Sequence, residues 1–180
     1  NGEKIAIHVS NFRPVKRAHA VVELFARVHR QIPSRLLMVG DGPELGEATR
    51  LARSLGISDA VEFLGEQEQV VPLLSAADVF ILPSVQESFG LAALVAMACE
   101  VPVVAPRVGG LPEVIEHEKT GFLHAGDDMD GMARSILRLL TDDVLHREMA
   151  VAARASARRR FCGDKIIPLY EHLYQESLAD

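Results

Sequence analysis

Long apolar runs, cysteine and tryptophan are scarce or missing in this chain of 180 residues. The longest apolar stretch, Leu91–Cys99, has about nine residues, whereas a helix needs roughly twenty to span a bilayer. The two cysteines, Cys99 and Cys162, form neither a disulfide framework nor a CxxC pair. We therefore expect a cytoplasmic protein without a membrane span.

Positive charge is also in the minority, with 19 Lys and Arg against 25 Asp and Glu and a net charge of -6. This balance disfavours nucleic acid or an anionic membrane as the main partner. The seven histidines show no HExxH or Cys/His spacing, and no serine lies in a GxSxG motif. We therefore expect no metal, no cofactor and no hydrolysis by a serine nucleophile. The oligomeric state leaves no trace in the sequence.

Apolar residues make up 48% of the chain, enough for the core of one domain, which we expect over residues 1–180. Short β-branched runs alternate with longer amphipathic segments, which is typical of βαβ units. The six expected strands are Ile5–Val9, Leu36–Val39, Val61–Leu64, Val79–Leu82, Val103–Ala105 and Gly121–Leu123. The expected helices cover about 18–31, 44–55, 68–76, 88–99, 111–116, 129–140, 143–159 and 165–178.

This pattern predicts an α/β fold, a Rossmann-like doubly wound parallel sheet with extra C-terminal helices. In such a sheet the ligand lies beyond the carboxyl ends of the strands, where the strand order reverses. If the order is 3-2-1-4-5-6, the loops Ser10–Arg17 and Pro83–Ser88 face one crevice. The loop Pro106–Gly110 then flanks it.

The first of these loops carries three cations, Arg13, Lys16 and Arg17, just before a predicted helix. Such groups can neutralise a diphosphate, although loop cations are often only solvated. Their position at the predicted reversal of strand order favours the binding role. The loop lacks the GxxxxGK[ST] pattern of a P-loop.

The other two loops each allow two interpretations. Ser84-x-x-Glu87 matches a capping box at the start of the helix expected over 88–99, where free N–H groups bind anions or sugar hydroxyls. The same pattern caps a helix without any ligand. Gly109 and Gly110 let backbone approach a ligand closely, but an ordinary tight turn uses the same residues.

Four segments share their order and spacing with one enzyme family. They are FLG at 63–65, LPSVQESFGLAAL at 82–94, VPVVAPRVGGLPEVI at 101–115 and KTGFL at 119–123. Together they resemble the C-terminal, nucleotide-binding domain of family 4 (group 1) retaining glycosyltransferases, over nearly the whole chain. The segment HVSNFRPVKR at 8–17 is most similar to members that join N-acetylglucosamine from UDP-GlcNAc to L-malate in bacillithiol biosynthesis.

The resemblance implies half of a two-domain GT-B enzyme: this chain binds the UDP-sugar, and an N-terminal acceptor domain is absent from it. Arg13 and Lys16 would bind the donor diphosphate and offset its charge without a metal. Glu87 would hold hydroxyl groups of the donor sugar. The other donor-binding positions that it implies are Ser88, Phe89, Gly90, Leu91, Leu64, Gly65, Gly109 and Gly110.

Three positions depart from the family pattern. Val95 stands where the family has a second Glu that binds the ribose hydroxyls, and losing such a bond costs on the order of 1.5–3 kcal/mol. Glu100 replaces a glycine just past a helix, where a positive φ should cost about 1 kcal/mol. Arg17 falls where many relatives have glycine.

Two functions remain open on this basis. The first is the donor-binding half of a retaining glycosyltransferase, inactive on its own. The second, motivated by Val95 and Glu100, is a non-catalytic Rossmann-like module with lost or weakened nucleotide binding.

Overall fold

Six short runs of β-branched and other apolar residues form one parallel sheet in the computed structural model, which describes residues 2–179. The strands are β1 (Lys4–Val9), β2 (Ser34–Val39), β3 (Val61–Gly65), β4 (Val79–Ile81), β5 (Val103–Pro106) and β6 (Gly121–His124). Their order is β3-β2-β1-β4-β5-β6, and every pairing is parallel. The predicted Rossmann-like sheet is confirmed, and its strand order is the one on which the expected grouping of the loops was conditional.

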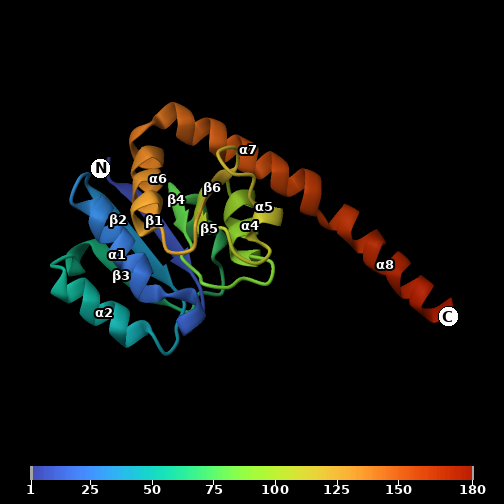
Figure 1. Ribbon diagram of the computed structural model, residues 1–180, viewed down its shortest axis with the longest axis horizontal. Coiled ribbons are helices and arrows are strands. Elements are labelled where there is room, and N and C mark those ends of the chain that lie inside the picture. The colour runs from blue at the N-terminus through green and yellow to red at the C-terminus, as the bar shows by residue number, and fades with distance from the viewer. Residues whose placement is uncertain (1, 180) are drawn as a thin grey trace.

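Helices connect the strands and cover both faces of the sheet (Figure 1). They are α1 (Ala18–His29), α2 (Leu45–Ser54), α3 (Val71–Ser75), α4 (Leu91–Ala98), α5 (Leu111–Val114), α6 (Met129–Thr141), α7 (Asp143–Phe161) and α8 (Gly163–Ala179). Two short 3-10 turns, η1 (Pro14–Lys16) and η2 (Ser58–Ala60), precede α1 and β3.

Alternate residues of each strand enter two separate apolar clusters. Ala6 of β1 joins the cluster with α1, α2 and α6, whereas its neighbour Ile7 joins the cluster with α3, α4 and α5. In β4, Val79 and Phe80 divide in the same way. Strands covered on both faces read as continuous apolar runs, which is why the sequence indicates them clearly.

The start of α4 differs from the prediction, because the helix begins at Leu91 instead of near residue 88. Gly90 has a φ of 92°, a left-handed conformation that ends the preceding loop. Ser84 and Glu87 therefore lie in a loop and form no capping box on α4. The Ser84 hydroxyl donates to the Glu87 carboxylate instead, at 2.9 Å.

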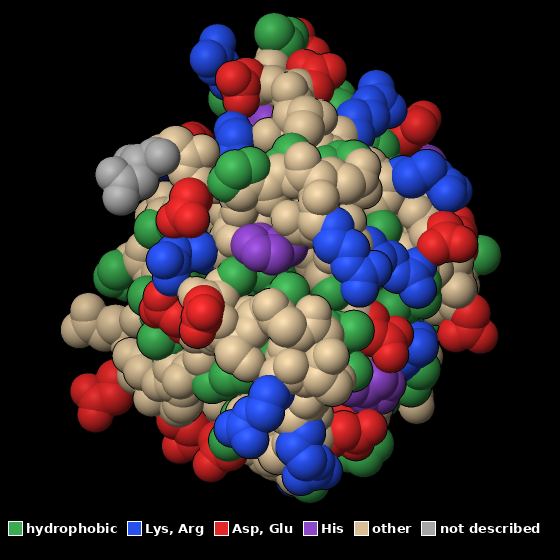
Figure 2. Space-filling model, turned by 90° about the vertical axis from the view of Figure 1, so that its left-hand side faces the viewer, with side chains coloured by type: hydrophobic (Ala, Val, Ile, Leu, Met, Phe, Trp, Pro, Cys, Tyr) green, Lys and Arg blue, Asp and Glu red, His purple; other side chains and the backbone are tan. Residues whose placement is uncertain are grey.

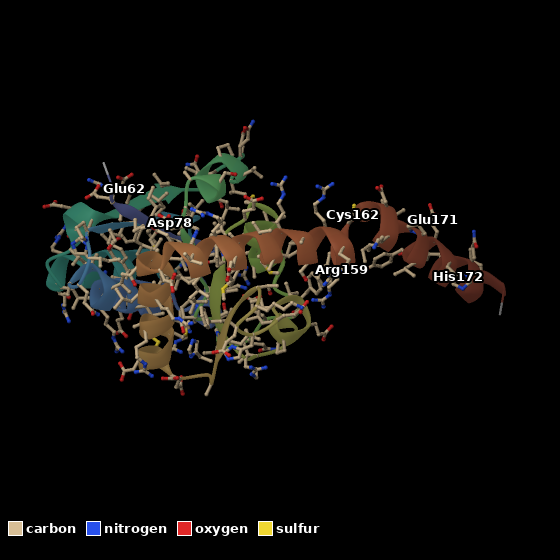
Figure 3. The ribbon with its side chains drawn as sticks, turned by 90° about the horizontal axis from the view of Figure 1, so that it is seen from above. Glu62, Asp78, Arg159, Cys162, Glu171 and His172 are labelled. Atoms are coloured by element: carbon tan, nitrogen blue, oxygen red, sulfur yellow. The ribbon has the colours of Figure 1, made fainter. Side chains whose placement is uncertain are left out.

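The last helix, α8, projects away from the body of the domain (Figure 1). Figure 3 shows Cys162 at the junction of α7 and α8, with Glu171 and His172 beyond it on the projecting helix. None of the helices within residues 2–179 combines the length and the apolarity that crossing a bilayer requires.

Glu100 follows α4 with a φ of 64°, so the expected left-handed conformation at this position is confirmed. A side chain with a Cβ is strained in this region of φ. The Glu100 carboxylate pairs with Arg154 at 2.8 Å, but both side chains are exposed, and such pairs stabilise a fold only weakly.

Replacing Glu100 with glycine should raise the free energy of unfolding by about 1 kcal/mol, because glycine adopts this conformation without strain. Urea unfolding measures the change. Glu100→Ala is the matched control, since it loses the ion pair but keeps the Cβ, and it should show no gain. A Glu100→Gly variant less stable than the parent would contradict the argument.

Candidate functional site

The carboxyl ends of β1 and β4 meet where the strand order reverses, the place where such a sheet binds its ligand. Two backbone hydrogen bonds join the loops that follow β1, β4 and β5. The Val85 N–H donates to the Val15 carbonyl at 3.0 Å, and the Gly110 N–H donates to the Glu87 carbonyl at 3.0 Å. The structure thus brings together the three loops that the sequence indicates.

Lys16 and Glu87 form an ion pair between two of these loops, with Nζ and Oε1 2.6 Å apart. The Glu87 side chain is only 8% exposed and that of Lys16 is 23% exposed. The Ser84 hydroxyl donates to the same carboxylate oxygen. Since an ionised carboxylate offers about four acceptor positions, Glu87 retains capacity for the hydroxyl groups of a ligand.

The other two cations of the first loop differ in their contacts. The Arg13 side chain is exposed and makes no hydrogen bond or ion pair with residues 2–179, although the Arg13 carbonyl accepts the Lys16 N–H at 2.8 Å. Arg17 has a φ of 54° and contacts Asp127, with Nη1 and Oδ1 3.4 Å apart. Arg13 and Lys16 can therefore face an anion at the crevice, whereas Arg17 is directed to the loop before α6.

Gly109 and Gly110 allow two loops to touch. A Cβ at Gly109 would lie 1.7 Å from the Glu87 carbonyl oxygen, and one at Gly110 would lie 2.5 Å from the Ser88 carbonyl oxygen. Gly109 also has a φ of 51°. The close approach that these glycines permit is thus to the loop carrying Glu87, and their contact with a ligand stays a prediction.

The segment after Glu87 exposes Ser88, Phe89 and Leu91 and buries Gly90. The Phe89 ring meets Phe161 edge-on at 5.5 Å, so the side chain faces α7 and α8. It borders an apolar cavity of about 420 Å³ lined by Phe89, Leu94, Phe161, Ile166, Leu169 and Tyr170. Donor contacts from this segment remain predictions.

Three further predicted positions lie on other elements. Leu64 and Gly65 end β3 at the same edge of the sheet, and the Gly65 carbonyl accepts the Gly40 N–H at 2.8 Å. Val95 is partly buried in α4 and packs against the apolar cluster. Contacts of these residues with a nucleotide remain predictions.

Beneath the crevice lies a buried histidine that the sequence pattern did not single out. His8 is fully buried in β1; its Nδ1 lies 2.8 Å from the Ile81 carbonyl and its Nε2 lies 2.8 Å from Ser10 Oγ. Burial lowers the pKa of His8 to about 4; the Ile81 hydrogen bond and Glu87 oppose the shift, and Lys16 adds to it. The ring is therefore neutral at physiological pH. The signal in the sequence was a single polar residue inside the apolar run of β1.

One group of possible metal ligands combines His19 in α1 with Glu44 and Glu47 at the start of α2. The buried Nδ1 of His19 lacks a hydrogen-bond partner and lies 3.5 Å from Glu44 Oε1. The other oxygen of Glu44 accepts the Ala18 N–H at the start of α1, at 2.9 Å. Because the positive end of the helix dipole opposes a cation there, helix capping explains Glu44 better than metal binding does.

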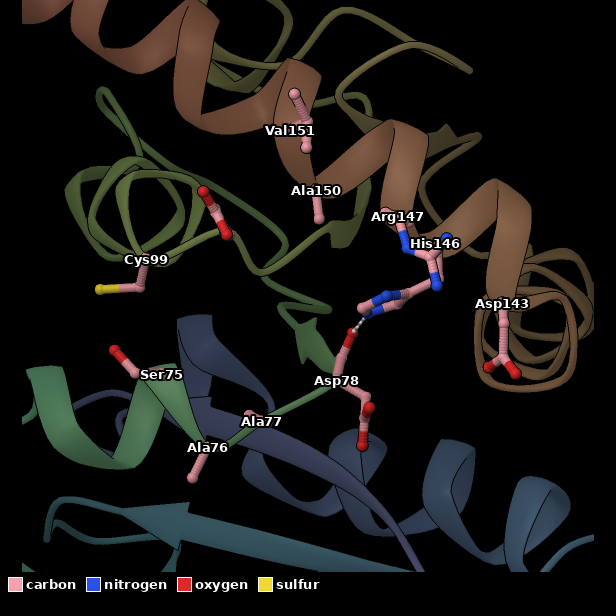
Figure 4. Close-up of a pocket in the computed structure, with 11 residues that line it drawn as sticks. Ser75, Ala76, Ala77, Asp78, Cys99, Asp143, His146, Arg147, Ala150 and Val151 are labelled. Atoms are coloured by element: carbon pink, nitrogen blue, oxygen red, sulfur yellow. Dashed lines mark hydrogen bonds between the residues drawn. The ribbon is translucent and has the colours of Figure 1, made fainter. Parts of the chain in front are cut away.

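A polar cavity of about 400 Å³ lies at the opposite edge of the sheet, before β4 and β5 (Figure 4). His146 borders it and donates from Nε2 to the Asp78 carbonyl at 2.8 Å. No cation of the first loop reaches this cavity.

On the face shown in Figure 2, acidic and basic side chains are interspersed, as the modest net charge leads us to expect.

Comparison with known proteins identifies the sequence family to which the chain belongs. Residues 1–159 match the sequence family described as glycosyl transferases group 1. The chain is 47% identical over 178 residues to N-acetyl-alpha-D-glucosaminyl L-malate synthase of Bacillus anthracis, covering 99% of this chain and 47% of that protein. It is 38% identical over 163 residues to D-inositol 3-phosphate glycosyltransferase of Mycolicibacterium smegmatis, covering 86% of this chain and 36% of that protein.

Solved structures show the same fold. Anabaena HepE in complex with UDP and glucose superposes with a TM-score of 0.88 at 26% identity, over 99% of this chain and 49% of HepE. A mutant of S. aureus TarM in complex with UDP gives a TM-score of 0.91 at 25% identity, over 97% of this chain and 36% of TarM. The chain thus spans half or less of the length of these relatives.

The depressed pKa of His8 predicts a loss of stability in acid. Between pH 6.5 and about 4 the unfolded chain binds a proton at His8 that the folded chain does not, so unfolding becomes easier as pH falls. The stabilisation is complete above pH 6.5, and its slope below is at most about 1.4 kcal/mol per pH unit. Urea unfolding from pH 7 to pH 4 should show a shallower decline for His8→Gln. Parallel declines in both proteins would refute the assignment.

Proposed function

Because the chain belongs to the group 1 glycosyl transferases, we propose that it is the donor-binding part of a retaining enzyme of that family. In this proposal the enzyme transfers a sugar, N-acetylglucosamine, from a UDP-sugar to a small acceptor such as L-malate. The activity for which the Bacillus anthracis relative is named and the UDP in the HepE and TarM structures support this choice. The remaining half of the enzyme would supply most of the acceptor site.

The observation that carries the proposal is the arrangement of Arg13, Lys16 and Glu87 at the reversal of strand order. Within residues 2–179, Arg13 and Lys16 form no ion pair with a carboxylate other than Glu87, and two such cations suit a diphosphate. When the bond between the sugar and the diphosphate breaks, the departing UDP gains negative charge, which Arg13 and Lys16 would stabilise. Glu87 would accept hydrogen bonds from the sugar hydroxyls and fix the sugar beside the diphosphate.

The second candidate is a non-catalytic module with the same fold. Val95 favours it, because a partly buried isopropyl group cannot accept hydrogen bonds from ribose hydroxyls. The two candidates differ in one measurable property, the affinity of this chain for UDP.

Calorimetric titration of UDP, with ADP and GDP as controls, should show binding of UDP to the 180-residue chain. Val95→Glu should bind UDP at least about tenfold more tightly, because a carboxylate restores charge-assisted bonds to ribose. If neither protein binds UDP at millimolar concentration, the non-catalytic candidate is favoured.

The chain alone should transfer little sugar to L-malate, and efficient transfer would contradict the proposed division of the enzyme.

Arg13→Ala should weaken UDP binding by about tenfold or more, because a charge-assisted bond to the diphosphate is removed. The free energy of unfolding should be unchanged, since the Arg13 side chain is exposed and makes no hydrogen bond or ion pair within residues 2–179. Arg30→Ala, at the far end of α1, is the matched control and should bind UDP like the parent. Equal affinities for all three proteins would remove Arg13 from the site.

A further inference from the structure

The donor and the acceptor can be assigned in both hydrogen bonds of the His8 ring. A carbonyl oxygen only accepts, so His8 Nδ1 carries the proton and donates it to Ile81 on β4. Nε2 is then the acceptor, and it receives the hydroxyl hydrogen of Ser10. The neutral ring thus ties the end of β4 to the first residue of the loop that carries the cations.

The Ser10 hydroxyl continues the chain by accepting the Phe12 N–H at 3.2 Å. Phe12 is fully buried and has a φ of 37°, which is an outlier for a bulky side chain. Its carbonyl accepts the Glu44 N–H at 3.0 Å. Such a conformation costs on the order of 1–3 kcal/mol and persists only where surrounding contacts hold it.

The strained turn at Phe12 directly precedes Arg13 and Lys16, the cations of the proposed site. Gly40 and Gly42 close its other side, because a Cβ on either would lie within 2.0 Å of the Ser10 or Asn11 carbonyl oxygen. The turn is therefore fixed by the His8 and Ser10 hydrogen bonds on one side and by backbone packing on the other.

We propose that His8, acting through the Ser10 hydroxyl, is a positioning residue that holds the left-handed turn at Phe12 and so presents Arg13 and Lys16 to the donor diphosphate. This inference rests on the proposed function, since UDP binding is its readout. His8 itself is fully buried and touches no ligand in this scheme.

Two amide substitutions separate the two hydrogen bonds of the ring. The amide of His8→Gln reaches the Nε2 position and can accept the Ser10 hydroxyl, whereas the shorter amide of His8→Asn reaches only the Nδ1 position and Ile81. His8→Gln should keep UDP affinity within about threefold of the parent. His8→Asn should lose about tenfold, as should Ser10→Ala, which leaves the Phe12 N–H unpaired.

His146→Gln is the matched control. His146 also donates to a carbonyl next to β4, that of Asp78, but at the opposite edge of the sheet (Figure 4). Its substitution should leave the dissociation constant for UDP unchanged. Calorimetry gives the affinities, and urea unfolding gives the stability of each variant.

The outcomes are distinct. A parent chain that does not bind UDP refutes the proposed function itself. A parent that binds UDP, with His8→Asn and Ser10→Ala binding equally well, overturns only the role of His8. An equal loss of UDP affinity in His8→Gln and His8→Asn also overturns this role. So does a loss of affinity that parallels the loss of unfolding free energy across all variants, His146→Gln included. If His8→Asn does not fold, Ser10→Ala decides the question.

Discussion

The contact between Gly109 and the Glu87 carbonyl is the constraint on which the candidate site depends. Only a residue without a Cβ fits there, because a Cβ would lie 1.7 Å from that oxygen. The approach lets the Gly110 N–H bond the same carbonyl, which fixes the backbone of Glu87. The Glu87 side chain can then reach Lys16, which lies 71 residues earlier in the chain. The Gly109-Gly110 turn therefore helps to place Glu87 against Lys16, a residue distant in the sequence.

Lys16 and Glu87 are both largely buried, and each neutralises the charge of the other. Taking both groups out of water costs about as much as their attraction returns, so the pair adds little net stability. Removing one partner would leave the other charge uncompensated. A diphosphate beside Lys16 and sugar hydroxyls beside Glu87 would supply each charge with a new partner, so the pair suits a ligand that carries both kinds of group.

The sequence predicts the strands of the sheet well, because strands buried on both faces leave nearly uninterrupted apolar runs. It predicts the start of α4 poorly, since residues 83–90 bond to other loops and Gly90 adopts a left-handed conformation. The strain at Phe12 and the contacts of His8 were not predictable, because they depend in part on Gly40, Gly42 and Ile81, which lie far away along the chain. A lone histidine in an apolar strand is compatible with many environments, and only the structure shows its partners.

Two of the departures from the family pattern, Val95 and Glu100, lie in or directly after α4, and this placement limits their effect. The loop with Glu87 is held by Val15, Lys16 and Gly110, all outside α4. Val95 packs into the apolar cluster, and Glu100 is exposed at the end of the helix remote from Glu87. The lack of a carboxylate at position 95 thus leaves the cations and Glu87 in place. For the proposed donor site, the physical expectation is weakened affinity for the nucleotide with the cations and Glu87 still in place.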